Sequence, residues 1–148
     1  MMKIYLDMCC YNRPYDTQAA NRIKLETEAK LYIQNTVLDG ELILVWSFIL
    51  DYENSANPYP DHREAIAEWK TLSKHYISAF DSIRELGAII ATKTGIKSKD
   101  SLHLACAVEA KCDCFITTDR TLLKKAQSLP EIKTVNPIDF AILLENSR

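Results

Sequence analysis

Four acidic side chains stand where the predicted strands and helices of this sequence begin or end. Asp7 and Asp119 each follow directly after a short apolar run that predicts a strand. Glu53 lies on the segment that leaves another such run, and Asp100 lies in the first turn of a predicted helix. Any one of these acids, taken alone, is more simply explained as a turn residue or a helix-terminal residue.

Taken together, the four acids indicate a different chemistry. Clustered carboxylates repel one another, so at neutral pH they take up protons or bind cations. Carboxylate oxygens are ligands that suit Mg²⁺ or Mn²⁺. One or two such ions, about 4 Å apart or less, can activate a water molecule and stabilise an in-line phosphoryl transition state. The acids therefore form a candidate metal site for phosphoryl-transfer chemistry.

The acids can converge only if the fold brings strand ends together, and the hydrophobic pattern predicts such an α/β fold. Four strands are predicted, over residues 3–6, 42–46, 114–117 and 132–135. Residues 42–46 are apolar without alternation, which is typical of a strand buried on both faces of a parallel sheet. Ligands of open parallel sheets bind outside the carboxyl ends of the strands, so we expect all four acids at one edge of the sheet.

Helical periodicity fills the intervals between these strands. One helix is predicted from near Thr17 to Gly40, and an apolar stripe from Ala65 to Tyr76 predicts another. Further helices are expected after Ser47, before Gly95, from Ser98 onward and after Pro137. No long linker interrupts the pattern, so residues 1–148 are predicted to form a single domain.

The composition is that of a globular protein, with 47% hydrophobic and 26% charged residues, and it excludes a disordered chain. The longest apolar stretch stops at Asp51, short of the roughly 18–20 residues that span a bilayer, so no transmembrane helix is expected. No export signal is visible at the N-terminus, and we expect a cytoplasmic protein whose five cysteines are reduced thiols. The net charge of −2 does not by itself indicate nucleic-acid binding, although two bound divalent ions would reverse its sign.

Four segments together carry a resemblance to a known family. They are residues 4–7 with the Asn12-Arg13-Pro14 turn, residues 47–53 ending in Glu53, residues 99–105 (Lys-Asp-Ser-Leu-His-Leu-Ala) and residues 115–119 (Phe-Ile-Thr-Thr-Asp). In this order and at these spacings, they make the chain resemble the PIN-domain ribonucleases, and most closely the VapC-like toxins of bacterial toxin–antitoxin pairs. The resemblance covers nearly the whole chain. Ser101 stands where many members have alanine, a small-for-small change that we expect to be harmless.

The resemblance implies a three-layer α/β/α domain around a central parallel sheet of four to five strands. It implies that Asp7, Glu53, Asp100 and Asp119 are both the metal ligands and the catalytic residues. The implied activity is Mg²⁺- or Mn²⁺-dependent endonucleolytic cleavage of single-stranded or structured RNA. The implied partners are an antitoxin whose segment fills the acidic groove and, in a homodimer, a second copy of the chain.

Several residues near the acids are candidate substrate contacts. Arg13 could bind a substrate phosphate through its guanidinium group or pair with a nearby acid, and neither alternative is favoured. Asn12 could orient its turn, which is the favoured role, or bind a metal-bound water, and Thr118 is a further candidate whose hydroxyl could hold such a water or satisfy backbone groups. Thr117 is interpreted as a structural residue. His103, three residues after Asp100, is interpreted as a hydrogen-bonded and partly buried side chain, although it could serve as a proton donor.

Other interpretations of the sequence stay open beside the nuclease. The first alternative is a catalytically silent PIN-like module that binds RNA or a protein. A phosphatase that uses Asp7 as a covalent nucleophile is disfavoured, because Cys9 stands where that class has a second aspartate. Asp51, two residues before Glu53, is expected to be solvated, although it is the nearest rival for the second ligand. Lysines flank the expected site and could contact phosphates, namely Lys93, Lys97, Lys99, Lys124 and Lys125.

Overall fold

The protein folds around one five-stranded parallel sheet in the order β3-β2-β1-β4-β5. The computed structural model describes residues 1–147. Its strands are β1 (Lys3–Leu6), β2 (Ile43–Ser47), β3 (His75–Ile77), β4 (Cys114–Ile116) and β5 (Lys133–Val135). Its α-helices are α1 (Met8–Asn12), α2 (Asn21–Leu38), α3 (Phe48–Ser55), α4 (Pro60–Leu72), α5 (Asp81–Thr94), α6 (Ser98–Glu109), α7 (Arg120–Ala126) and α8 (Pro137–Asn146), and a 3₁₀ turn, η1 (Arg13–Tyr15), follows α1.

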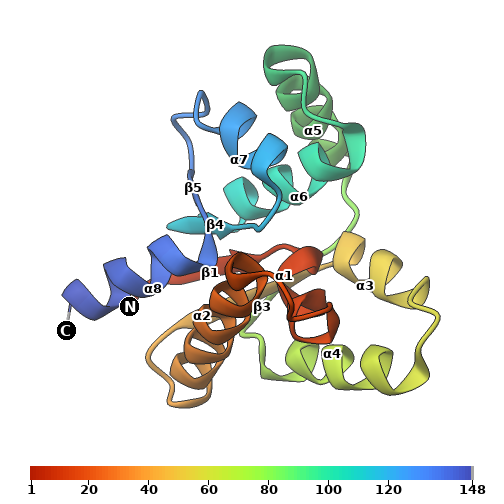
Figure 1. The fold of residues 1–148 in the computed structure, drawn as a ribbon. Coiled ribbons are helices and arrows are strands. Elements are labelled where there is room, and N and C mark those ends of the chain that lie inside the picture. Colours follow the sequence, from red (N-terminus) through yellow and green to blue (C-terminus); the bar gives the residue numbers. More distant parts are fainter. Residues whose placement is uncertain (148) are drawn as a thin grey trace.

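Helices cover both faces of the sheet, which gives the α/β/α arrangement that the family resemblance implied. Figure 1 shows α2 and α4 on one side of the sheet and α5, α6 and α7 on the other. The central strand β1 pairs with β2 on one side and with β4 on the other. Ile4, Tyr5 and Leu6 of β1 are fully buried because both faces of this strand are covered. The prediction of an α/β fold with a parallel sheet is confirmed.

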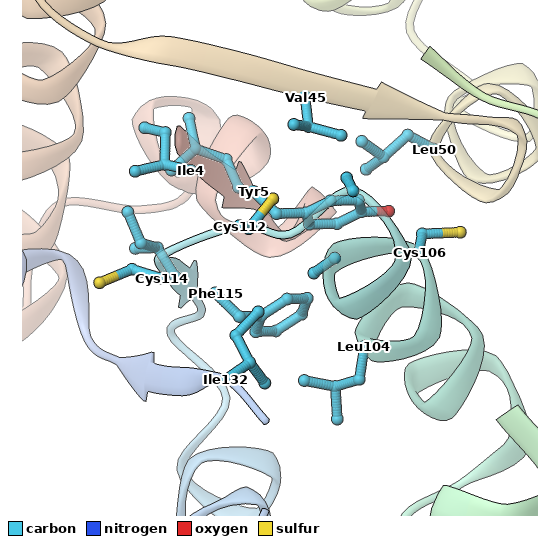
Figure 2. Packing of buried hydrophobic residues seen from close by; sticks show 14 of the residues in the cluster. Ile4, Tyr5, Val45, Leu50, Leu104, Cys106, Cys112, Cys114, Phe115 and Ile132 are labelled. Carbon is cyan, nitrogen blue, oxygen red and sulfur yellow. The ribbon is translucent and has the colours of Figure 1, made fainter. Parts of the chain in front are cut away.

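The core lies between the sheet and the helices that cover it. Figure 2 shows Tyr5 and Phe115 from neighbouring strands beside Leu104 of α6 and Ile132 near β5. The rings of Tyr5 and Phe115 are stacked with their centroids 5.3 Å apart. Such interdigitated, fully buried side chains fix α6 against β1, and α6 is a helix that carries candidate site residues.

The predicted helix boundaries need two corrections. The helix expected from near Thr17 begins at Asn21, because η1 and a short loop occupy the residues before it. The apolar stripe that was extended to Tyr76 ends with α4 at Leu72, and Tyr76 belongs to the edge strand β3. The strand β3 has three residues, and its middle residue, Tyr76, is 41% exposed. Three residues are too few for alternating burial to distinguish a strand from the end of a helix in the sequence.

Gly95 ends α5 in the left-handed conformation, with φ +74°, as expected for a C-terminal glycine. All five cysteines are free thiols. Within residues 1–147, no helix combines the length and the apolar character needed to cross a membrane.

Candidate metal centre

The strand order places a candidate ligand site between β1 and β4. The chain runs from β1 outward to β2 and β3, and then returns to build β4 and β5 on the opposite side of β1. Adjacent strands whose connections leave in opposite directions leave a crevice at their carboxyl ends. Asp7 directly follows β1, and Thr117, Thr118 and Asp119 directly follow β4. Two of the four predicted acids therefore flank this crevice.

The carboxylate of Asp7 is 6% exposed and is held by three short-range contacts. Its Oδ1 accepts a hydrogen bond from the backbone N–H of Met8 at 2.8 Å, which caps α1. Its Oδ2 accepts one from the hydroxyl of Thr117 at 2.9 Å and lies 3.4 Å from the thiol of Cys9. A carboxylate has about four lone-pair positions, so these contacts orient Asp7 and still leave it able to bind a cation.

Glu53 reaches the same place from α3. The helix begins where the hydroxyl of Ser47 accepts a hydrogen bond from the backbone N–H of Leu50, as the sequence predicts. Glu53 Oε1 is hydrogen-bonded to Nε2 of His103, and that nitrogen lies 3.8 Å from Oδ1 of Asp7. One ligand atom from each of Asp7, Glu53 and His103 lies within 4.8 Å of the other two, which is a spacing that could hold a metal ion.

A chain of hydrogen bonds continues behind His103 into the core. Its Nδ1 lies 2.6 Å from the hydroxyl of Tyr5, which lies 2.6 Å from the hydroxyl of Ser47. Because an ionised Glu53 carboxylate only accepts hydrogen bonds, Nε2 of His103 carries a proton, and in this state His103 orients Glu53 and does not itself bind a metal ion. In the neutral ring Nδ1 must then accept from Tyr5. Buried Tyr5 and Ser47 thus orient the His103 ring toward Glu53.

The acids determine the proton affinity of His103. Burial alone would lower its pKa, but the hydrogen bond to Glu53 and the charges of Asp7, Glu53 and Asp100 raise the pKa above its usual value. Burial also raises the pKa of Tyr5 well above its usual range, so the phenol stays protonated. His103 is hydrogen-bonded, as predicted, but it is completely buried, whereas partial burial was expected. Its direct contact with Glu53 was not predicted.

Asp100 and Asp119 extend the acidic cluster on the side of α6 and α7. Burial and the charge of Asp7 raise the pKa of Asp100 most, His103 partly offsets this rise, and Asp119 and Glu53 add smaller increases. Asp119 Oδ1 accepts hydrogen bonds from the backbone N–H groups of Thr121 and Leu122, which cap α7. Asp100 and Asp119 line one cavity of about 130 Å³, but neither belongs to the tight group of Asp7, Glu53 and His103.

The predicted substrate contacts have different environments. The guanidinium of Arg13 pairs with Asp16 at 2.9 Å and with the buried Glu26 at 3.0 Å, which is the pairing alternative considered above. Asn12 lines a pocket together with Glu53. Thr118 is 4% exposed, and its backbone N–H contacts the sulfur of Cys9 at 3.4 Å.

The prediction for Thr117 is confirmed, whereas the prediction for Asp51 is wrong. Thr117 is structural, as predicted, since its hydroxyl donates to Asp7 and accepts from the backbone N–H of Asp119 at 3.1 Å. Asp51 was expected to be solvated, but its carboxylate is held by hydrogen bonds within the protein. It accepts hydrogen bonds from Trp46 Nε1 at 2.8 Å and from the Tyr76 hydroxyl at 2.6 Å. Burial would raise the pKa of Asp51, but these hydrogen bonds outweigh burial and the pKa is lowered.

Sequence comparison finds no matching family model and no curated relative for this chain. Comparison with solved structures does find similar folds. The chain is similar to a chain of VapBC2 from Rickettsia felis, solved with a DNA fragment from its promoter, with TM-score 0.58, 15% identity, 91% of this chain and 98% of that chain covered. It is similar to PAE2754 from Pyrobaculum aerophilum, with TM-score 0.59, 15% identity, and 98% and 96% covered.

A third similar structure is VapBC-1 from nontypeable Haemophilus influenzae, with TM-score 0.57, 18% identity, and 93% of this chain and 98% of that chain covered. At these identities the likeness concerns the fold, and it extends over nearly the full length of each pair of chains. The fold expected from the resemblance is confirmed, because the five-stranded parallel sheet with its covering helices is the PIN-like fold, which the chain shares with these VapBC structures.

Proposed function

We propose that this protein is a divalent-metal-dependent endoribonuclease that acts as the toxin of a toxin–antitoxin pair. The observation that carries the proposal is the meeting of Asp7 and Glu53 with His103 at the carboxyl edge of the sheet, within 4.8 Å. Asp100 and Asp119 lie at the same edge and add negative charge. The likeness to VapBC structures supports the toxin–antitoxin assignment.

The residues of the site fit a hard divalent cation. Asp7, Glu53, Asp100 and Asp119 supply carboxylate oxygens, which are the ligands that Mg²⁺ and Mn²⁺ prefer. The raised pKa of Asp100 reflects an excess of negative charge in a half-buried place, which a cation would relieve. A bound ion would supply an activated water and stabilise charge on the phosphate.

The chain's own side chains have distinct roles in this proposal. The four acids hold the ion, while Thr117 fixes the orientation of Asp7 and His103 that of Glu53. Asn12, Arg13 and Thr118 are proposed as contacts of the RNA substrate. An antitoxin segment that covers the acidic groove and a second copy of the chain in a homodimer are the proposed protein partners.

Cleavage of total cellular RNA by the purified protein, separated from any antitoxin, tests this function. The assay compares Mg²⁺, Mn²⁺ and EDTA, and it includes Asp7→Asn and Asp119→Asn. The matched control is Asp61→Asn, which neutralises an exposed acid in the first turn of α4. We expect discrete fragments that require metal, that persist in the control and that are absent with both site variants.

Failure of the folded, metal-loaded protein to cut RNA would contradict the enzyme. RNA binding without cleavage would instead support the alternative of a silent binding module.

A further inference from the structure

A second, larger pocket opens beside the acidic cluster. Its volume is about 470 Å³, and Glu53 and Lys99 form part of its wall. Lys99 Nζ lies 3.8 Å from Glu53 Oε2, so the positively charged ammonium group of Lys99 lies where the pocket meets the acidic cluster. The pocket lies next to the proposed metal centre, and apart from Asn12 the rest of its wall has no role in the function proposed above.

Aromatic rings make up much of that remaining wall. Tyr15 of η1 and His62 of α4 are stacked, with centroids 3.9 Å apart and an angle of 13° between their planes. The ring of Tyr59, at the start of α4, also contacts the His62 ring, and the two ring centroids are 5.0 Å apart. Tyr52 of α3, which directly precedes Glu53 in the sequence, completes the aromatic wall. The rings come from three separate elements and converge on one pocket.

Two of these rings are exposed to an extent that packing does not explain. Tyr52 is 64% exposed and Tyr59 is 61% exposed. A large aromatic side chain normally buries most of its surface, and exposed aromatic rings gathered in one concave place mark a binding surface. Both side chains therefore present exposed aromatic surface at the wall of the pocket.

The loop that carries Tyr59 is held in place before any ligand arrives. The side-chain oxygen of Asn57 accepts a hydrogen bond from the backbone N–H of Tyr59 at 3.0 Å. The guanidinium of Arg63 donates to the backbone carbonyl of Asn57 at 2.9 Å, and the side chain of Asn54 donates to the carbonyl of Arg63. Binding therefore requires little ordering of this loop, which favours affinity.

We propose that this pocket binds unpaired bases of the RNA strand beside the scissile phosphate, which selects single-stranded substrate. The proposal rests on the ribonuclease function proposed above. Bases can stack on Tyr52 and Tyr59 with little regard to sequence, because every base has an aromatic face. Asn12 and Asn57 line the same pocket and offer amide groups that can pair with base edges.

The chemistry of the pocket favours RNA over a protein segment. Flat exposed rings, side-chain amides and a lysine are the elements that single-stranded nucleic-acid sites combine, namely stacking surfaces with a cation for the backbone. In a duplex the bases are already stacked on one another and cannot enter, so paired RNA should be excluded.

The test measures binding of fluorescent ten-nucleotide single strands, rA10, rC10 and rU10, in Ca²⁺. Stacking on an aromatic ring is lost when the ring is removed, so Tyr52→Ala and Tyr59→Ala should each weaken binding by about tenfold. Tyr52→Phe and Tyr59→Phe keep the ring and should retain the wild-type affinity. Phe80→Ala is the matched control, since Phe80 is an equally exposed ring (61%) outside the lining of this pocket.

A second arm removes the bases instead of the rings. Strands with abasic positions should bind the wild-type protein and the Tyr52→Ala Tyr59→Ala double variant with equal affinity, since neither complex can stack. Circular dichroism melts check that the alanine variants are folded.

Two results would overturn the proposal: folded alanine variants that bind the intact strands as tightly as the wild type, or a wild type that binds none of the strands. Either would leave the rings to a protein partner. Cleavage of RNA in Mn²⁺ is measured in parallel. Cleavage with ring-independent binding refutes the base pocket alone, whereas ring-dependent binding without cleavage refutes the nuclease alone.

Discussion

At the scale of single residues, the acids of the candidate metal centre depend on neighbours that are not acids. Asp7 accepts a hydrogen bond from the Thr117 hydroxyl, and Glu53 is hydrogen-bonded to His103. Hydrogen bonds from a second layer of residues orient metal ligands and tune their affinity. The strength of metal binding should therefore respond to changes that leave all four acids in place.

Removal of the Thr117 hydroxyl should weaken the metal site without unfolding the protein. Thr117→Val keeps the shape of this buried side chain but removes the donor to Asp7. Loss of such a partner typically lowers metal affinity by about 10–100-fold. Titration calorimetry with Mn²⁺ measures the change. Thr117→Ser retains the hydroxyl and should stay close to the wild type, and equal affinity of all three proteins would contradict this role.

The acidic cluster should also make the stability of the metal-free protein depend on pH. The pKa of Asp100 is raised, first by burial and then by Asp7 and other acids, so the folded state binds its proton more tightly than the unfolded state. Stability then falls as pH rises from the unfolded pKa of about 3.9 through the higher folded pKa. Above that window the whole penalty is present.

Asp100→Asn, which has no carboxylate to ionise, should accordingly raise the Tm in EDTA at pH 7. The difference from the wild type should shrink toward pH 3, where Asp100 is protonated in both states. Thermal melts across this pH range measure both effects. A variant that is less stable than the wild type at pH 7 in EDTA would show that Asp100 is not electrostatically strained.

At the scale of elements, a buried acid joins three segments at the sheet edge beside the site. Glu26 of α2 is fully buried and pairs with Arg13 of η1 at 3.0 Å and with Arg22 at 3.3 Å. The side chain of Asn136, which caps α8, donates to Glu26 as well. Glu26 thus ties α2 to the turn that follows Asp7 and to the start of the last helix.

Loss of this junction should cost substantial stability. Glu26→Ala leaves the buried Asn136 amide without its acceptor and leaves Arg13 with Asp16 as its remaining partner, and a buried polar group that loses its hydrogen-bond partner costs about 1–3 kcal/mol. Urea denaturation measures the free energy of unfolding. The control is Glu28→Ala, an exposed position on the same helix, which should change stability by about 0.5 kcal/mol or less.

At the scale of the whole molecule, the strand order decides which segments meet at the carboxyl edge of the sheet. The order β3-β2-β1-β4-β5 puts the crevice between β1 and β4, where Asp7 and Asp119 begin α1 and α7. Acids that come from distant parts of the chain repel one another in the folded state only, so a cation that binds them stabilises the fold as a whole.

Metal should therefore raise the melting temperature of the entire domain. At a free Mn²⁺ concentration about 100 times the dissociation constant, the stabilisation is about 2.7 kcal/mol, or about 5–10 °C for a chain of this size. EDTA should reverse the shift, and Asp7→Asn should abolish it. The same shift in Asp7→Asn as in the wild type would place the bound metal elsewhere.

The local sequence pattern determined the sheet and the positions of the four acids. Buried strands such as residues 42–46 are apolar runs, and strand ends are marked by polar residues, so the parallel sheet and the acids at its edge were predictable. The three-residue strand β3 was not, because it is too short to show a period.

The tertiary structure decided which partners these residues meet. His103 contacts Glu53, which is 50 residues away, and Thr117 contacts Asp7, which is 110 residues away. Arg13 pairs with Glu26 rather than standing free, and Asp51 is bound by Trp46 and Tyr76. The convergence of Tyr15, Tyr52 and Tyr59 on one pocket likewise follows from packing. Spacing along a chain encodes burial and turns, whereas contacts between distant residues exist only once the strands are ordered and the helices are packed upon them.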